Sequence, residues 1–561
     1  MISTYTLNHF GMVAGICQEL QLCHTIDALI PPDPQQTVTT GQAVVAMILN
    51  GLGFSNRTLY LFPQFFENKP VELLIGKGLT AEKLNDDTIG RTLDRLFNYG
   101  CTELFCSVAS VATAMATVDR KFGHLDTTTF SVHGDYHSSA EEGAAIQVTY
   151  GHSKEKRPDL KQIVLNLLVS ADGGIPLFMQ ALNGNSSDKI VFRQTVTEFR
   201  TGLKTNLQEV TYWIADSCFY TAATIKAVGT DVQWISRVPG TLQEAKEVIE
   251  KRARPLLAAR PAPPSPKARA EASVIPLLAD GYSYVPHNAT YGEVTQRWLV
   301  IHSEQAETRA LHSVEAMVKK EFAKLCRLRK KLQKKEFQSE EEAEESLQEL
   351  QAQAKYHTGQ RSHVSREVKY KRRGRPRKVP RTNEKHRYYQ VEYSITKNEQ
   401  AIELEVIKSA IFIVATNELN AEKLRDQEVF DNYKGQNQVE RGFRFLKDPL
   451  FFASSLFLKK PERIVALTMV MCLSLLVYSI GERKLRQLLQ EQGETIQNQV
   501  KKPTPRPTLK WIFQLFEDVH LVKIEEPMKT PVYEVKNLRP DGIKVLKILG
   551  KNYLEPYLLT K

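Results

Sequence analysis

Five short runs of residues that begin near Phe122 constrain the fold of this chain most. They read LDTTTFSV, AIQVTYGHS, KQIVLNLLVSADG, EVTYWIADS and VQWISRV, are rich in β-branched residues, and are bounded by Gly, Asp or Ser. Runs of this kind predict strands, and YTAATIKAV before the last of them predicts a helix. Three successive strands, followed by strand, helix and strand, predict an α/β domain over residues 119–240.

Residues 1–118 have a different pattern. GQAVVAMILNGLG and DDTIGRTLDRLFNYGCTELFCSVASVATAMA carry apolar residues at helical spacing, and Asp86 or Asp87 is placed to cap the second segment. This predicts an all-α N-terminal domain. The pattern suits a DNA-binding module and a dimerisation module equally well.

The segment YKGQNQVERGFRFLK surrounds one carboxylate with cationic and hydroxyl groups. On a helix, Tyr433, Glu440 and Lys447 stand seven residues apart and form one polar stripe, with Arg441 and Arg444 close by. An ordinary amphipathic helix with a solvated charged side explains the segment as well. Two aspartates upstream decide between these interpretations.

Asp126 lies in the first strand-like run and Asp216 in the fourth. Two aspartates and a glutamate can hold two Mg²⁺ or Mn²⁺ ions, which prefer oxygen ligands. Such a pair activates a hydroxyl on one side of a phosphodiester and stabilises the leaving oxygen on the other. The chain has no G-x4-G-K-[ST] phosphate loop, so ATP hydrolysis is not indicated, and no G-x-S-x-G run.

At these residues the chain resembles the DDE transposases of bacterial insertion sequences, in the branch with a Y-x2-R-x3-E-x6-K signature. Tyr433, Glu440 and Lys447 match the signature, whereas Gln436 stands where it has arginine, so no phosphate contact is carried over to that position. The resemblance extends to DTT after Asp126 and to the runs ALNGNSSD, IADS and FIVATN.

The resemblance implies an RNase H-like catalytic core with a large inserted domain. In that fold Asp126 lies within the first strand, Asp216 at the end of the fourth and Glu440 on a later helix, so the three converge as catalytic residues and metal ligands. The implied activity is cleavage of element ends and their joining to target DNA by transesterification. The residues expected to contact DNA near the site are Tyr433, Lys447, Arg441 and Arg444.

A stretch of 224 residues separates Asp216 from Glu440 and is too long for a loop. It predicts an inserted domain over residues 241–404, with the core resuming at 405–490 and a tail, possibly for dimerisation, at 491–561. The insertion contains a basic block followed by an acidic block, which suggests two helices that pack against each other by charge.

Two further DNA contacts are expected in the insertion. RGRP, with Arg373 and Arg375, matches the core of an AT-hook, in which two guanidinium groups enter the minor groove of A·T-rich DNA. A flexible basic linker explains the same residues. Related transposases stack a flipped base on an aromatic ring of the insertion, and Trp298 is the candidate, although a tryptophan beside Leu299 and Val300 is more often part of a strand core.

Composition sets the remaining expectations. A net charge of +11 and a pI of about 9.0 favour a polyanionic partner, although charge alone does not separate nucleic acid from an anionic membrane or from simple solubility. The clustering of the charge favours double-stranded DNA. Seven cysteines without a C-x2-C pair indicate neither disulfides nor zinc, and the N-terminus lacks a secretory signal, so a cytoplasmic protein is expected. Residues 464–481 approach membrane-spanning length, but their hydroxyl residues favour a buried core helix. Neither a membrane nor a nucleotide partner is predicted.

The sequence therefore predicts a cytoplasmic, magnesium-dependent DDE transposase. It is expected to act as a homodimer or higher oligomer, because two element ends must be handled together. One alternative is a catalytically inactive DNA-binding regulator derived from a transposase, and another is a metal-dependent nuclease without strand transfer. Intact Asp126, Asp216 and Glu440 argue against the first alternative but not against the second.

Overall fold

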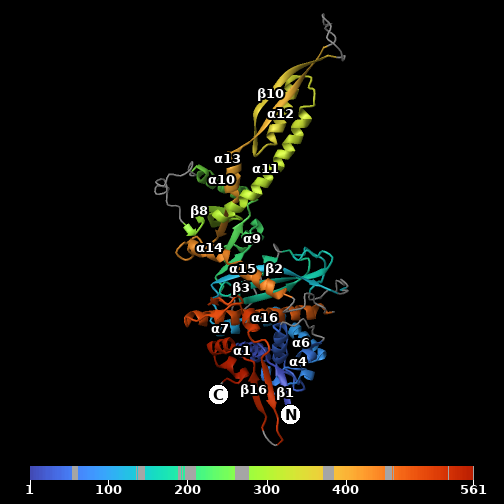
Figure 1. Ribbon diagram of the computed structural model, residues 1–561, viewed down its shortest axis with the longest axis vertical. Coiled ribbons are helices and arrows are strands. Elements are labelled where there is room, and N and C mark those ends of the chain that lie inside the picture. The colour runs from blue at the N-terminus through green and yellow to red at the C-terminus, as the bar shows by residue number, and fades with distance from the viewer. Residues whose placement is uncertain are drawn as a thin grey trace. The chain divides into compact units, whose positions relative to one another are not determined.

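The computed structural model describes most of the chain in two compact units (Figure 1). Unit 1 comprises Met1–Ser236, Thr290–Thr295 and Thr416–Lys561, and unit 2 comprises Arg237–Ala289 and Gln296–Ala415. Both contain helices and strands, so the predicted mixed α/β class is confirmed. The described residues are 1–53, 61–133, 136, 146–187, 191–192, 194–195, 210–258, 277–370, 385–448, 458, 460–527 and 530–559.

The sheet of unit 1 places its strands in the order β4-β3-β2-β5-β6. Strand β3 runs antiparallel to both β2 and β4, whereas β5 runs parallel to both β2 and β6. The direction of the chain in the sheet therefore changes at β2, the central strand. The bounds are β2 Phe122–Val132, β3 Lys161–Ser170, β4 Pro176–Leu182, β5 Tyr212–Ala215 and β6 Gln233–Val238, with α9 Ala222–Val228 between the last two.

One predicted strand is wrong. AIQVTYGHS contains no strand among its described residues, and Thr149 makes only an isolated bridge with Gln162. The third strand of the meander is instead β4, which returns from β3 through Gly173 and Gly174 at φ of 88° and 66°. Glycine adopts such angles without strain. The sequence of β4, PLFMQAL, has no β-branched residue, which is why composition did not identify it.

Helix α16, Pro461–Glu491, is the central helix of unit 1. It contacts β4 and helices α3, α6, α7, α15 and α18, and most of its apolar residues belong to one core with theirs. It is the only helix in the described part of the chain that is long and apolar enough to cross a membrane, and 94% of its apolar window is buried. This burial agrees with the core helix expected for residues 464–481.

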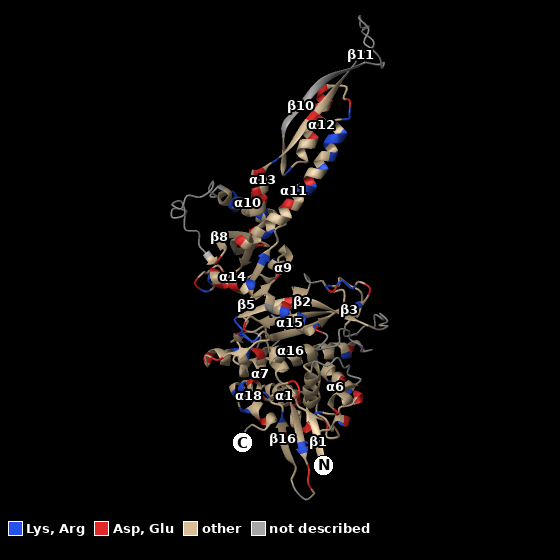
Figure 2. Cartoon of the chain, in the orientation of Figure 1, with Lys and Arg blue, Asp and Glu red and all other residues tan. Residues whose placement is uncertain are grey.

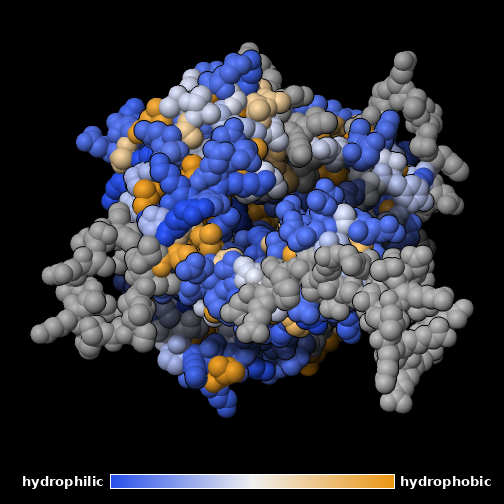
Figure 3. Space-filling model, turned by 90° about the horizontal axis from the view of Figure 1, so that it is seen from above, coloured by the Kyte–Doolittle hydropathy of each residue, from blue (hydrophilic) through white to orange (hydrophobic). Residues whose placement is uncertain are grey.

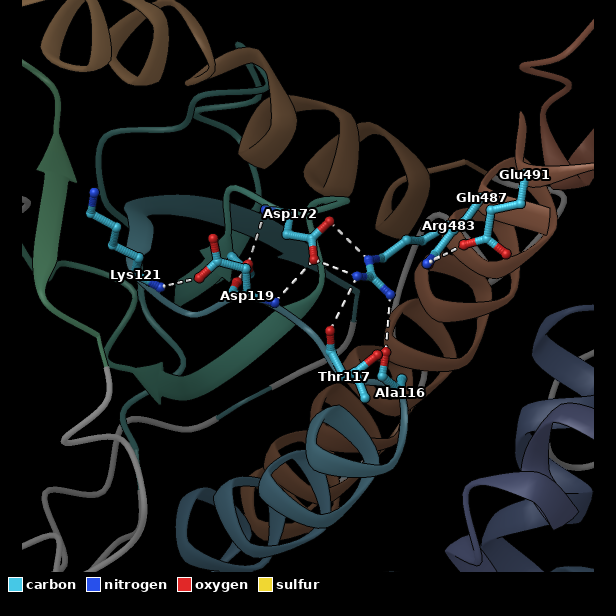
Figure 4. Close-up of polar contacts among 9 residues, drawn as sticks. Ala116, Thr117, Asp119, Lys121, Asp172, Arg483, Gln487 and Glu491 are labelled. Atoms are coloured by element: carbon cyan, nitrogen blue, oxygen red, sulfur yellow. Dashed lines mark hydrogen bonds and ion pairs between the residues drawn. The ribbon is translucent and has the colours of Figure 1, made fainter. Parts of the chain in front are cut away.

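Arg483 on α16 joins three parts of unit 1 (Figure 4). Its Nε donates to Asp172 Oδ1 (2.8 Å) in the turn between β3 and β4, and its terminal nitrogens donate to the carbonyls of Ala116 (3.0 Å) and Thr117 (3.2 Å) after α7. The second carboxylate oxygen of Asp172 accepts from the Asp119 amide (3.0 Å). The planar guanidinium of Arg483 thus donates both to acceptors at the end of α7 and to an acceptor in the turn between β3 and β4.

The N-terminal residues and the tail share the core of unit 1. Strand β1, Ile2–Thr6, pairs with β15, His520–Ile524, which pairs in turn with β16, Val532–Lys536. The segment expected to be all-α therefore begins with a strand whose partner lies in the tail. The helices of unit 1 are α1 Phe10–Glu19, α2 Leu22–Leu29, α3 Thr40–Gly51, α4 Phe62–Phe66, α5 Val71–Leu74, α6 Asp86–Tyr99, α7 Cys101–Met115, α14 Asp426–Lys434, α15 Asn437–Leu446, α16, α17 Leu509–Gln514, α18 Pro540–Leu549 and α19 Lys551–Leu554, together with α9.

In its described residues, unit 2 contains adjacent strands in the order β12-β9-β8-β7, a long hairpin and four helices. The helices α11 and α12 pack through apolar side chains that include Leu325, Leu347 and Leu350, not mainly by charge as the sequence suggested. The bounds are α10 Gln243–Ala258, β7 Leu277–Ala279, β8 Tyr282–Tyr291, β9 Val294–Ser303, α11 Glu304–Leu332, α12 Glu340–Ala352, β10 His357–Tyr370, β11 Lys385–Lys397, α13 Glu399–Ser409 and β12 Ile411–Thr416.

Candidate active site

The backbones of Asp126, on β2, and Asp216, the first residue after β5, lie side by side. In the parallel pair of β2 and β5, Leu125 is the register partner of Ala215, and the next residue on each chain is the aspartate. Register partners of parallel strands direct their side chains to the same face, about 4.8 Å apart. Two of the three predicted carboxylates are therefore brought together, and both are half-buried.

Local hydrogen bonds hold both aspartates. Strand β5 ends at Ala215, and Asp216 Oδ1 accepts from the amide of Cys218 (2.9 Å), while the Asp216 carbonyl accepts from Ser236 Oγ on β6 (2.9 Å). Asp126 Oδ1 accepts from the amide of Thr127 (2.7 Å). The pair thus lies at the carboxyl end of β5, beside the central strand where the sheet changes direction, which is a frequent position for ligand sites in open sheets.

The segment from α14 to α15 runs alongside β2. At one end a Cβ on Gly435 would lie 3.3 Å from the His124 ring, and at the other the Lys447 ammonium lies 5.7 Å from the centre of the Phe130 ring. His124 and Phe130 occupy the same face of β2 as Asp126, since strand side chains alternate. From Gly435 to Lys447 a helix rises about 18 Å, and β2 rises about 20 Å from His124 to Phe130.

These two contacts place Glu440 level with Asp126. The helical rise from Gly435 to Glu440 is about 7.5 Å, and the strand rise from His124 to Asp126 is about 6.6 Å. Helix α15 also contacts both β2 and β3. The element that carries the third predicted carboxylate therefore passes over β2, at the level of Asp126, and over β3.

The Glu440 side chain itself is exposed. Across the described parts of the chain, no group of three or more His, Cys, Asp or Glu side chains is arranged to hold a metal ion. The donor set consists of oxygen atoms only, which fits Mg²⁺ or Mn²⁺.

The predicted single helix over Tyr433–Lys447 is two helices. Tyr433 lies in α14, and Glu440 lies in α15 after a turn at Gly435 and Gln436. Glycine disfavours helix and here packs against the buried His124 ring, so the interruption coincides with the contact to β2. Tyr433 is half-buried, whereas Arg441 and Arg444 are exposed.

Lys447, the predicted phosphate contact, forms an ion pair with Glu155. Its Nζ lies 3.1 Å from Glu155 Oε1, and Glu155 Oε2 accepts from Ser131 Oγ of β2 (2.6 Å). The side chains of Lys447 and Glu155 are 24% and 27% exposed, so an incoming anion can reach the Lys447 ammonium and displace Glu155 from it. The acid was not identified from the sequence, where it is one of several charges in SKEKRPD.

Lys154 is a second residue that sequence reasoning missed. Its Nζ donates to the Thr127 carbonyl (2.7 Å) and to Thr127 Oγ1 (2.8 Å), and lies 3.9 Å from Asp126 Oδ1. Its amide donates to Thr129 Oγ1 (3.1 Å). The loop between β2 and β3 thus brings the Lys154 ammonium beside Asp126. The sequence could not predict this, because it depends on which residues of β2 the loop contacts.

Two titratable residues support the position of α14 and α15. Burial lowers the pKa of His124 to about 4, so its ring is neutral at pH 7 and can lie in an apolar contact with Gly435. Lys121 donates to Glu428 on α14 (2.8 Å) and thereby lowers the pKa of that carboxyl to about 2. The ion pair attaches α14 beside the start of β2.

The remaining candidates lie elsewhere. Arg373 and Arg375 fall outside the described residues. Trp298 lies on β9, is 1% exposed, and donates from Nε1 to Gln296 Oε1 (3.1 Å). Its ring is within the interior of the structure, so a base could stack on it only after β9 had moved.

Comparisons with known proteins identify the family. No curated protein matches the chain. Among solved structures, the chain is similar to the piggyBac transposase in a synaptic complex with hairpin DNA, at 8% identity and a TM-score of 0.34, over 89% of this chain and 80% of that one. A domain of unknown function, DUF4277, matches residues 2–110, and the Transposase DDE domain matches residues 119–477. Because the second match spans more than half of the 561 residues, the chain belongs to the Transposase DDE domain family.

Proposed function

We propose that this protein is a DNA transposase that cleaves the ends of a mobile element and joins them to target DNA by metal-dependent transesterification. The proposal is supported most by the register of the parallel strands β2 and β5, which brings the backbones of Asp126 and Asp216 together, and by the contact of α15, which carries Glu440, with β2. The strand order β4-β3-β2-β5-β6, with its antiparallel first half and parallel second half, supports an RNase H-like core.

Asp126, Asp216 and Glu440 would hold two Mg²⁺ or Mn²⁺ ions. Bound ions of this kind activate the attacking hydroxyl and stabilise the leaving oxygen of a phosphodiester. The two aspartates are held by backbone hydrogen bonds and provide the fixed part of the site. Glu440 is exposed on α15 and would supply the third carboxylate.

The cationic residues around the site would position DNA. Arg441 and Arg444 are exposed on α15, and Tyr433 offers a hydroxyl from α14. Lys447 can exchange its partner Glu155 for a phosphate next to the scissile one. A protein of net charge +11 is attracted to duplex DNA as a whole, and we place its action in the cytoplasm, on the DNA of the cell, as an oligomer that holds two ends.

The decisive assay combines labelled duplexes of the element ends, taken from the sequences that flank the gene, with Mg²⁺ and a plasmid target. Wild-type protein is expected to release cleaved ends and to form joined products. Asp216→Asn keeps the shape of the side chain but removes a negative ligand, so cleavage should collapse while binding to the end duplex survives.

Each other outcome has a distinct meaning. Cleavage without joined products would point to the nuclease alternative, and binding without cleavage by the wild type would point to the regulator alternative. Retained cleavage in Asp216→Asn would remove that residue from the site and overturn the proposed arrangement.

A further inference from the structure

Helix α11 of unit 2 carries a row of basic side chains with no role in the proposed site. Lys320, Lys324, Arg327 and Lys331 follow one another at intervals of four, three and four residues, and all four are exposed. At 100° per residue they occupy about 60° of the helix circumference. Figure 2 shows Lys and Arg gathered toward the end of α11 that leads into α12. We call these four residues the basic row.

The acidic residues of α11 do not lie on the same side of the helix as the basic row. Glu307, Glu315 and Glu321 lie on other sides of the helix, because their positions differ from the row by about 60° or more. Each has its own partner: Glu307 contacts His302 (2.7 Å), Glu315 contacts Lys319 (2.7 Å) and Glu321 contacts His357 (2.9 Å). The charge of the basic row is therefore not offset by acids of its own helix.

The acidic helix α12 does not offset the row either. It meets α11 on the side of Leu325, Leu328 and Leu332, about 100° around the helix from the basic row. Within the described residues no ion pair joins a member of the row to an acid, and the pair between the two segments, Lys335 with Glu342, lies beyond the end of α11. Like charges three and four residues apart destabilise a helix, so the basic row destabilises α11.

We propose that the basic row is a binding surface for the phosphate backbone of duplex DNA. It spans about 17 Å, over which a duplex presents about ten phosphate charges. Lysine predominates, and lysine meets a phosphate as a point charge without reading bases, so the surface holds DNA without sequence preference. The proposal deepens the proposed function, on which it rests, by assigning part of the DNA contact to unit 2.

Duplex DNA fits the row better than an anionic membrane does. A helix that lies on a membrane needs a continuous apolar face beside its basic one. The cores of unit 2 cover the side of α11 that carries Val314, Val318 and Leu325. Of its exposed apolar residues, Leu311 and Phe322 lie opposite the basic row and Met317 stands alone beside it, so they form no such face. Hydrophilic residues cover most of the molecular face seen in Figure 3, and the hydrophobic ones stand in small separate groups.

The test measures the affinity of the full chain for a duplex of arbitrary sequence between about 50 and 200 mM salt. The test variant is Lys324→Gln with Lys331→Gln. The control is Lys319→Gln with Lys355→Gln, which removes the same charge from the same unit at lysines paired with Glu315 (2.7 Å) and Glu405 (3.0 Å). Each lost phosphate contact lowers the slope of log affinity against log salt by about 0.9, so the test variant should lose about 1.8 and the control much less.

Equal slopes in the two variants would overturn the basic row as a DNA surface, as would a loss of binding to anionic vesicles without a loss of binding to DNA. Thermal unfolding of both variants verifies that they fold. The outcome is separable from the proposed function. If the wild type cleaves ends but the test variant keeps the salt slope of the wild type, only the basic row is disproved. A wild type whose slope depends on the row but which neither cleaves nor joins DNA disproves only the transposase.

Discussion

At the scale of single residues, the proposed phosphate contact of Lys447 requires that phosphate displace Glu155 from the Lys447 ammonium. Glu155→Gln removes the negative charge, so Lys447 becomes available and binding to the end duplex should tighten. Exposed and half-exposed ion pairs contribute about 0.2–1 kcal/mol, which corresponds to an affinity gain of no more than about fivefold. Measured affinities of Glu155→Gln, Lys447→Ala and the double variant form a cycle that checks this.

The gain should vanish when Lys447 is already alanine, because the acid then has no lysine to hold. An equal gain in both backgrounds would mean that Glu155 repels DNA directly and does not act through Lys447.

Substitution of Trp298 tests whether a DNA base stacks on this buried ring. Because the side chain is 1% exposed, Trp298→Ala should lower the free energy of unfolding by about 3–5 kcal/mol, whereas Trp298→Phe should cost less. Thermal unfolding and hairpin formation on element ends are measured on the same proteins. A Trp298→Ala protein that melts like the wild type but no longer forms hairpins would restore the stacking role.

At the scale of the element, Gly435 sets how closely the start of α15 approaches β2. A Cβ there would lie 3.1 Å from the Asn432 carbonyl oxygen and 3.3 Å from the buried His124 ring, which has little room to move. Gly435→Ala should therefore displace α15 and Glu440, and reduce cleavage more than end binding.

The matched control is Gly442→Ala, within α15 itself, where a Cβ meets only the end of the Leu475 side chain at 3.2 Å. Alanine is the better helix former, so this variant should keep or raise stability and retain cleavage. Equal loss of cleavage in the two variants would show that any added methyl group on α15 is harmful and that the contact with His124 is not special.

The elements also show what the sequence could predict. β-Branched composition identified β2, β3, β5 and β6, because those strands bury both faces or pack against helices. It failed for β4, whose Met179 and Leu177 fill the core without β-branching, and it predicted a strand around Thr149 that makes a single bridge. The break at Gly435 was missed because it depends on contact with a ring 311 residues away in the sequence.

For the site, sequence patterns named the two aspartates that the register of β2 and β5 places together. They could not name Lys154 or Glu155, since a charged loop has no periodicity, and its position is fixed by hydrogen bonds to Thr127, Thr129 and Ser131. Residues whose position depends on hydrogen bonds to a neighbouring strand show no recognisable sequence pattern.

At the scale of the whole molecule, two buried histidines make stability depend on pH. Burial lowers the pKa of both His9 and His124 to about 4, from an ordinary value near 6.5. The unfolded chain therefore binds more protons than the folded protein between pH 6.5 and 4, so the free energy of unfolding falls as pH falls through this window. Between pH 7 and pH 5 the loss is about 2 kcal/mol for each histidine.

Urea unfolding at pH 7 and pH 5 measures this loss in the wild type, in His9→Gln and in His124→Gln, with the exposed His312→Gln as control. Each buried substitution lowers stability at both pH values, but the difference between the two values is what carries the prediction. That difference should shrink by about 2 kcal/mol in each buried variant and stay unchanged in the control, because carboxyl groups, which titrate near pH 4, contribute little above pH 5. A wild-type difference that survives both buried substitutions would show that other groups control the acid sensitivity of the protein.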